Sequence, residues 1–189
     1  MAATEQRVVG GVELPPAGKW EFDKAHTSLE FVARHMLTKV RGRFERFDGT
    51  VQIADRPEDS TVRVEVDASS IQTGHEQRDT HLKSGDFFKV DDHPTLVFES
   101  TNVRPKEGAA FDIDGTLTIN GISNPVTLDA EFHGFGPGLS GGTVASFSAR
   151  TTIDREDWDM TWNMVVETGG FLVSKRIEID IEAELQFAG

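Results

Sequence analysis

Apolar and polar residues alternate with a period of two along most of the chain, which is the pattern of strands that bury one face. The clearest case is residues 177–187, where the polar positions are mostly acidic. Other segments follow the same rule: residues 28–35, 62–67, 96–101, 111–119, 126–133 and 147–153. The pattern predicts an all-β protein with about eight antiparallel, half-buried strands.

Turn and helix signals separate these segments. Asn120-Gly121 lies between two alternating runs, which is a strong signal for a hairpin turn. One helix is predicted at residues 74–84, because residues 73–76 have the spacing of a capping box and Gly85 stands where a helix would end. A second short helical or irregular piece is predicted at residues 155–163. Strands joined mainly by hairpins favour a closed up-and-down barrel.

The domain organisation follows from composition. No linker rich in proline, glycine or serine interrupts residues 19–189, so we expect them to form one barrel domain. Residues 1–18 are polar and lead into the domain through Pro15-Pro16, which predicts a flexible N-terminal arm. We find no apolar run long enough for a signal peptide or a membrane span. We therefore expect a cytoplasmic protein without stable membrane insertion.

The charge of the chain restricts its partners. The sequence has 32 acidic and 19 basic residues, which gives a formal net charge of −13 at pH 7. This charge argues against binding to nucleic acid and against general binding to anionic membrane surfaces, since both need excess positive potential. The absence of cysteine excludes disulfides and thiolate metal sites. The sequence does not decide between a monomer and a homodimer.

One stretch departs from this acidic character. Five of the 19 Lys and Arg residues fall within residues 34–46 and are called the basic island here: Arg34, Lys39, Arg41, Arg43 and Arg46. Arg41 and Arg43 flank Gly42, where a ligand can approach the backbone closely. Two interpretations stay open. The island binds an anionic head group such as a diphosphate, or it is a solvated strand edge whose charge discourages pairing between sheets.

His35 alternates in step with Leu29, Phe31 and Ala33, so the pattern predicts that its side chain points into the interior with theirs. There the imidazole would either hydrogen-bond the head group of a ligand or be satisfied by a backbone carbonyl.

We find no catalytic or metal-binding motif in the sequence. His75 and His81 are six residues apart on the predicted helix and point to different faces, and His26 lies nine residues from His35 on an extended segment. We expect no metal, no cofactor and no enzyme activity. A lipid isomerase or cyclase stays as an alternative, with His35 and Glu45 as its candidate acid or base.

Several short motifs occur in a fixed order along residues 19–187: Trp20-x-Phe22-Asp23-x-x-His26-Thr27-Ser28, Phe31 to His35, Gly42-Arg43-Phe44, Phe47-x-Gly49, Ser70-Ile71-x-Thr73, Arg78-Asp79-x-His81-Leu82-x-Ser84-x-Asp86-Phe87-Phe88, Pro94-x-x-x-Phe98-x-Ser100, Gly115-x-Leu117-Thr118-Ile119-x-Gly121 and Pro125-Val126-x-Leu128. In this order and spacing they resemble the YceI-like family, the lipocalin-like polyisoprenoid-binding proteins. The resemblance implies a single extended, eight-stranded, lipocalin-like antiparallel barrel with one short helix. It also implies a long isoprenoid or similar lipid in the barrel interior.

We therefore predict a binding or carrier protein for a long-chain isoprenoid or similar amphiphilic lipid, such as a polyprenyl diphosphate or a quinone. The predicted cavity is lined by apolar residues: Phe31, Phe44, Phe47, Phe98, Leu117, Phe132 and Phe147. His35, Arg41 and Arg43 are the predicted contacts to the ligand's head. Phe44 and Phe47 can share a face only if a bulge lies between them. The remaining alternative is a filled core without ligand, in a stress-associated structural protein.

Overall fold

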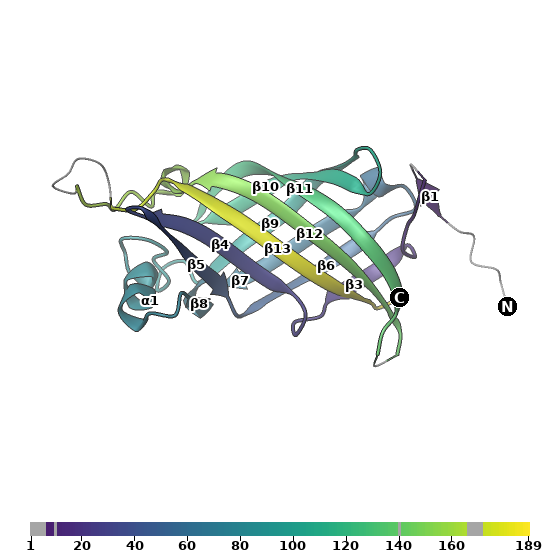
Figure 1. Ribbon diagram of the computed structural model, residues 1–189, viewed down its shortest axis with the longest axis horizontal. Coiled ribbons are helices and arrows are strands. Elements are labelled where there is room, and N and C mark those ends of the chain that lie inside the picture. The colour runs from purple at the N-terminus through teal and green to yellow at the C-terminus, as the bar shows by residue number, and fades with distance from the viewer. Residues whose placement is uncertain (1–6, 10, 140, 166–171) are drawn as a thin grey trace.

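The computed structural model describes residues 7–9, 11–139, 141–165 and 172–189. Antiparallel strands form an eight-stranded barrel that closes where β12 pairs with β13, and β13 pairs in turn with β3 and β4 (Figure 1). The predicted all-β barrel is therefore confirmed. The strands of the barrel sheet are β3 (Gly18–Phe22), β4 (Ser28–His35), β5 (Thr38–Phe44), β6 (Phe47–Ile53), β7 (Thr61–Asp67), β8 (Ile71–Gln72), β9 (Thr95–Pro105), β10 (Ala110–Ile119), β11 (Ile122–Pro137), β12 (Thr143–Asp154) and β13 (Arg176–Phe187).

Breaks in three of the long barrel strands explain why the sheet contains more segments than the barrel has strands. β3 and β4 follow each other along β13, pairing with residues 185–187 and 178–182 respectively. On their other edges they pair with β6 and β5, so β5 and β6 also make one interrupted strand. The third break separates β7 from β8 at the 3-10 helix η2 (Ala68–Ser70).

Local signals placed the turns and the helix well. Asn120 and Gly121 have φ angles of +52° and +72°, as a tight hairpin turn between β10 and β11 requires. Helix α1 (Glu76–Lys83) confirms the predicted helix, although its N-cap is His75 and not Thr73. The short helical piece predicted after β12 is the 3-10 helix η3 (Arg155–Trp158), and another 3-10 turn, η1 (Pro57–Asp59), precedes β7.

The described part of residues 1–18 contains a small hairpin of β1 (Val8–Val9) and β2 (Val12–Glu13). The guanidinium of Arg7 donates to the backbone carbonyls of Pro15, Ala54 and Asp55, which attaches this hairpin to the chain after β6. No pattern in the sequence predicts these contacts. The division into an arm and a domain at residue 19 stays a prediction, and β3 begins at Gly18.

The end of β4 lies outside the closed part of the barrel. The last residue of β4 that pairs with β13 is Val32, opposite Glu178, whereas pairing with β5 continues to His35 opposite Thr38. His35 is consequently exposed, and the prediction that it points into the interior is wrong. The alternation is preserved, but the strand has run past the neighbours that would cover this side chain.

Packed clusters fill the two ends of the barrel. Near α1, Trp158 and Phe87 are buried with Ile119 and Met160. At the other end, Trp20 and Leu185 are buried with Phe132. No helix in the described ranges is long and apolar enough to cross a membrane.

Candidate ligand-binding cavity

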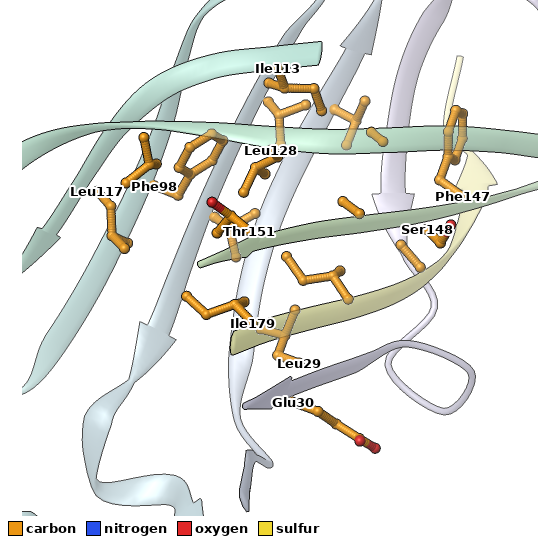
Figure 2. A pocket seen from close by; sticks show the side chains of 18 of the residues that line it. Leu29, Glu30, Phe98, Ile113, Leu117, Leu128, Phe147, Ser148, Thr151 and Ile179 are labelled. Atoms are coloured by element: carbon orange, nitrogen blue, oxygen red, sulfur yellow. The ribbon is translucent and has the colours of Figure 1, made fainter. Parts of the chain in front are cut away.

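The barrel encloses a cavity of about 360 Å³. Its lining is almost entirely apolar and reaches both ends of the barrel, with Leu82 and Phe88 at one end and Leu14 and Pro15 at the other. Figure 2 shows side chains such as Phe98 and Leu128 pointing into the space between the strands. The volume lies within the usual range of small-molecule sites, and the apolar lining suits a slender hydrocarbon chain.

Strand β13 shows that the interior is hollow. Ile177, Ile179, Ile181 and Ala183 face the cavity but are only half-buried, whereas Leu185, which packs against the Trp20 cluster, is 2% exposed. In a filled barrel core all of these residues would be fully buried, because protein interiors are close-packed. Their accessible surface is therefore available to a ligand.

Six residues of the predicted lining do line the cavity: Phe31, Phe44, Phe98, Leu117, Phe132 and Phe147. Their contact with a ligand stays a prediction. Gly42 supports this arrangement, because a Cβ at this position would collide with the ring of Phe31 on the neighbouring strand. A Cβ at Gly115 would likewise collide with the ring of Phe98 on the neighbouring strand. These two glycines make room for aromatic rings, which is a different role from the ligand approach expected at Gly42.

The remaining predicted contacts lie away from the cavity lining. Arg41 and Arg43 are exposed on the outer face of β5, because Gly42 and Phe44 take the inner positions opposite Phe31 and Leu29. His35 is exposed at the end of β4. These three residues are not part of the cavity lining, and their contact with a ligand head at the mouth of the barrel stays a prediction.

Phe47 is buried but packs edge-on against Phe22, with ring centroids 6.0 Å apart, and does not line the cavity. The bulge expected between Phe44 and Phe47 is a break in the strand at Glu45 and Arg46. The amide of Arg46 donates to Oγ of Ser70 over 3.0 Å there. Glu45 is exposed and pairs with Arg43 at 3.1 Å. Both candidate acid–base residues of the isomerase alternative, His35 and Glu45, thus lie outside the cavity.

Arg155 is a polar residue of the lining that the sequence did not single out. It is 2% exposed; its Nε donates to the carbonyl of Ser174 over 3.0 Å, and its Nη1 donates to the carbonyl of Met160. Its Nη2 is buried without a hydrogen-bond partner in the part of the chain that the structure describes. Burial lowers the pKa of Arg155 from its ordinary value. Only tertiary packing reveals this residue, because nothing local distinguishes it from exposed arginines.

A second polar group points into the cavity from β12. Figure 2 shows the hydroxyl of Thr151 directed toward the apolar side chains, whereas the carboxylate of Glu30 is directed away from them.

The end of the cavity that lies away from helix α1 is lined by Val9, Leu14 and Pro15 of the N-terminal segment. This segment therefore covers one end of the cavity, and Arg155 lies toward the other.

Asp23, His26 and Glu184 form a cluster that the sequence analysis did not foresee, since it compared His26 only with His35. Their ligand atoms lie within 4.8 Å of one another. Nδ1 of His26 lies 3.0 Å from Oδ2 of Asp23, and this hydrogen bond lowers the pKa of Asp23 and raises that of His26. Asp23 also accepts hydrogen bonds from the amide of Ala25 and the side chain of Gln186. The cluster thus ties the turn after β3 to β13.

Comparisons with known proteins agree with this fold. A family model described as YceI-like domain matches residues 20–185. A UPF0312 protein of Staphylococcus aureus strain N315 is 38% identical over 171 residues, which cover 88% of this chain and 96% of the relative. A UPF0312 protein of Staphylococcus aureus strain MW2 is 37% identical over the same length.

Solved structures share the barrel. The YCEI protein of Campylobacter jejuni has a TM-score of 0.72 at 26% identity, over 82% of this chain and 90% of its own. BcnA of Burkholderia cenocepacia has a TM-score of 0.77 at 20% identity, over 86% and 98%. A domain of Saccharophagus degradans described as polyisoprenoid binding has a TM-score of 0.65 at 13% identity, over 89% and 98%. On the family match and the identity to these relatives, the chain belongs to the YceI-like family.

Proposed function

We propose that the protein binds a long-chain isoprenoid or a similar slender lipid inside its barrel. The observation that carries the proposal is the accessible apolar surface within the closed barrel, which Ile177, Ile179 and Ile181 present on β13. Each five-carbon unit buried there would contribute on the order of 3 kcal/mol, before the cost of ordering a flexible chain. The fold shared with a polyisoprenoid-binding domain is consistent with this ligand class.

The same observations favour a binding protein over a lipid isomerase. An isomerase needs an acid or base beside its substrate, and both candidates from the sequence lie outside the cavity. They favour it over a ligand-free structural protein because a filled core would leave no accessible apolar interior. Native mass spectrometry of the purified protein, combined with organic extraction, tests the proposal, and a retained isoprenoid is the expected result.

Filling the cavity should separate ligand binding from folding. Ala183 faces the cavity opposite Phe147, so Ala183→Trp should occupy ligand space while keeping or raising thermal stability. We expect the affinity for geranylgeraniol to fall by at least about tenfold, because excluding one five-carbon unit from the cavity removes enough binding free energy for such a change.

The matched control is Glu182→Trp, which places the same bulk on the exposed face of the same strand. It should leave uptake unchanged. Normal uptake by a folded Ala183→Trp variant would contradict the proposed location of the ligand.

Arg155 is the residue that we expect to meet the polar end of the ligand. Its Nη2 donor lacks a partner in the described ranges, and a ligand oxygen would supply both an acceptor and, if anionic, a compensating charge. Arg155→Met should therefore lower the preference for geranylgeranyl phosphate over geranylgeraniol by about tenfold, since a hydrogen bond to a charged group contributes about 1.5–3 kcal/mol.

The ratio of the two affinities is the useful quantity, because Arg155 also holds the carbonyls of Ser174 and Met160 and its loss will disturb both ligands. Arg150→Met is the control: Arg150 lies on β12, the strand that leads into η3 and Arg155, but it pairs with Asp180 on the exposed face. An unchanged ratio in Arg155→Met would show that Arg155 acts only on the fold.

A further inference from the structure

The turn between β4 and β5 carries exposed apolar side chains beyond the closed barrel. β4 loses its pairing with β13 after Val32 and continues with β5 to the turn at Met36 and Leu37, with residues 172–174 bonded to its other edge. Leu37 is 91% exposed and Met36 is 53% exposed. Figure 1 shows this turn at the same end of the barrel as α1, opposite the end where the chain termini lie.

A second segment adds to this apolar surface. Met164 is 56% exposed and Val165 is 76% exposed. The segment is attached to the turn, since the amide of Met36 donates to the carbonyl of Leu172 over 2.8 Å and the amide of Leu172 donates to the carbonyl of Met164 over 2.9 Å. We call Met36, Leu37, Met164 and Val165 the apolar tip. Isolated exposed apolar residues are common, but four on two adjoining segments form a patch.

The basic island borders the apolar tip. Arg34, Lys39 and Arg41 lie exposed on the outer face of the β4–β5 ribbon, and Arg176 is exposed where β13 begins beside it. Acidic groups on this face partly offset the charge: Glu178 lies 3.5 Å from Lys39, Glu45 pairs with Arg43, and Glu30 lies opposite Arg43. Arg34, Arg41 and Arg176 make no ion pair with any described residue. Asp154 also lies opposite Arg176 in the register of β12 and β13. Next to the apolar tip, four cations (Arg34, Lys39, Arg41 and Arg176) therefore outnumber two carboxylates (Glu178 and Asp154), so the face is locally positive in a chain of net charge −13.

We propose that the apolar tip and the basic island dock this end of the barrel on an anionic membrane surface. Exposed Met, Leu and Val side chains on a protruding turn can enter the boundary between head groups and acyl chains, while neighbouring cations bind the anionic head groups. The negative charge of the rest of the molecule is repelled by the same surface, so only this end can approach it. Docking is peripheral and agrees with the absence of a membrane-spanning helix in the described ranges.

A second copy of the chain fits this surface less well, because two basic islands brought together would repel each other. The surface also adjoins the cavity: Val173, which lines the cavity, forms a β-bridge with His35 next to the apolar tip. If the proposed function holds, docking would place the Arg155 end of the cavity next to the bilayer, where a lipid enters or leaves. The docking itself does not depend on the identity of the ligand.

Vesicle flotation tests the proposal. The full-length protein should float with vesicles of phosphatidylglycerol and phosphatidylcholine at low salt, should float less as salt rises, and should not float with phosphatidylcholine alone. Leu37→Glu should reduce the floated fraction by at least about tenfold, because it replaces an inserting side chain by one that the surface repels. Its high exposure means that the fold should be unaffected.

Matched controls exist at the opposite end of the barrel. Leu139, between β11 and β12, is fully exposed, and Leu139→Glu should leave flotation unchanged. Arg34→Gln combined with Arg41→Gln should reduce flotation on anionic vesicles, while Arg56→Gln near η1 should not. Equal flotation of the wild type and Leu37→Glu would overturn the proposal. Equal flotation of the wild type with vesicles that contain phosphatidylglycerol and with vesicles of phosphatidylcholine alone would also overturn it. A third outcome would also overturn the proposal: the wild type binds no vesicles but self-associates in sedimentation experiments, and Leu37→Glu abolishes that self-association. The patch would then be an interface with a second copy of the chain.

The outcomes separate docking from ligand binding. A protein that floats normally but takes up no geranylgeraniol would contradict the proposed ligand and leave docking standing. Uptake of geranylgeraniol from detergent solution by a protein that does not bind anionic vesicles would contradict docking alone.

Discussion

Phe98→Asp is expected to abolish lipid retention and to destabilise the barrel by about 3 kcal/mol or more at neutral pH. Phe98 lies on β9 with its ring in the cavity lining, against the backbone of Gly115. The introduced carboxylate would have no partner in the apolar interior, and burial would raise its folded-state pKa above its unfolded value. A carboxyl group with a raised folded-state pKa destabilises the fold less when it is protonated. The loss in free energy of unfolding should therefore be smaller near pH 4 and should grow as pH rises.

Retention is measured by native mass spectrometry and stability by thermal unfolding at several pH values. The neighbouring Glu99→Gln is the control: Glu99 is exposed and pairs with Arg63, and exposed pairs contribute little. Equal retention and equal stability in Phe98→Asp would show that the inner face of β9 is assigned wrongly.

Trp158→Ala is expected to lower the free energy of unfolding by about 3–5 kcal/mol. Trp158 is 2% exposed and packs with Phe87 and Ile119 at the α1 end of the barrel. Its Nε1 donates to the carbonyl of Leu117 over 3.0 Å, and its own carbonyl accepts from Asn120. The substitution therefore leaves a large void and an unsatisfied acceptor in one place.

Urea denaturation measures this loss. Trp162→Ala is the comparison, because Trp162 is only half-buried and packs edge-on against His81, with ring centroids 4.5 Å apart. We expect it to cost clearly less. Similar losses in the two variants would mean that the cluster around Trp158 does not anchor this end of the barrel.

The class of fold and most of the lining of the cavity follow from the amino-acid sequence alone. Alternation with a period of two assigns each residue to one face of its strand, and this local rule correctly placed Phe31, Phe98 and Leu117 on the inner face. The turn at Asn120 was also local, because its left-handed conformation is needed wherever two strands reverse in two residues.

Tertiary structure decided which parts of a face are covered. His35 keeps the alternation of Phe31 and Ala33, but β13 begins at Arg176 and no longer pairs with this part of β4, so the same periodicity puts His35 in solvent. Arg41 and Arg43 obey the alternation as well. They lie on the outer face because their neighbours Gly42 and Phe44 occupy the inner face, and the predicted contact of the two arginines with a ligand head stays a prediction.

The hollow interior and Arg155 were beyond the reach of the sequence for a related reason. Apolar residues with a period of two are equally consistent with a filled barrel and with an empty one, because the size of the cavity depends on how the strands close around it. Whether Arg155 is exposed or buried depends on the carbonyls of Ser174 and Met160, which the folded chain brings around it. Periodicity therefore specifies on which face of a strand a residue lies, whereas closure of the barrel specifies which groups surround that residue.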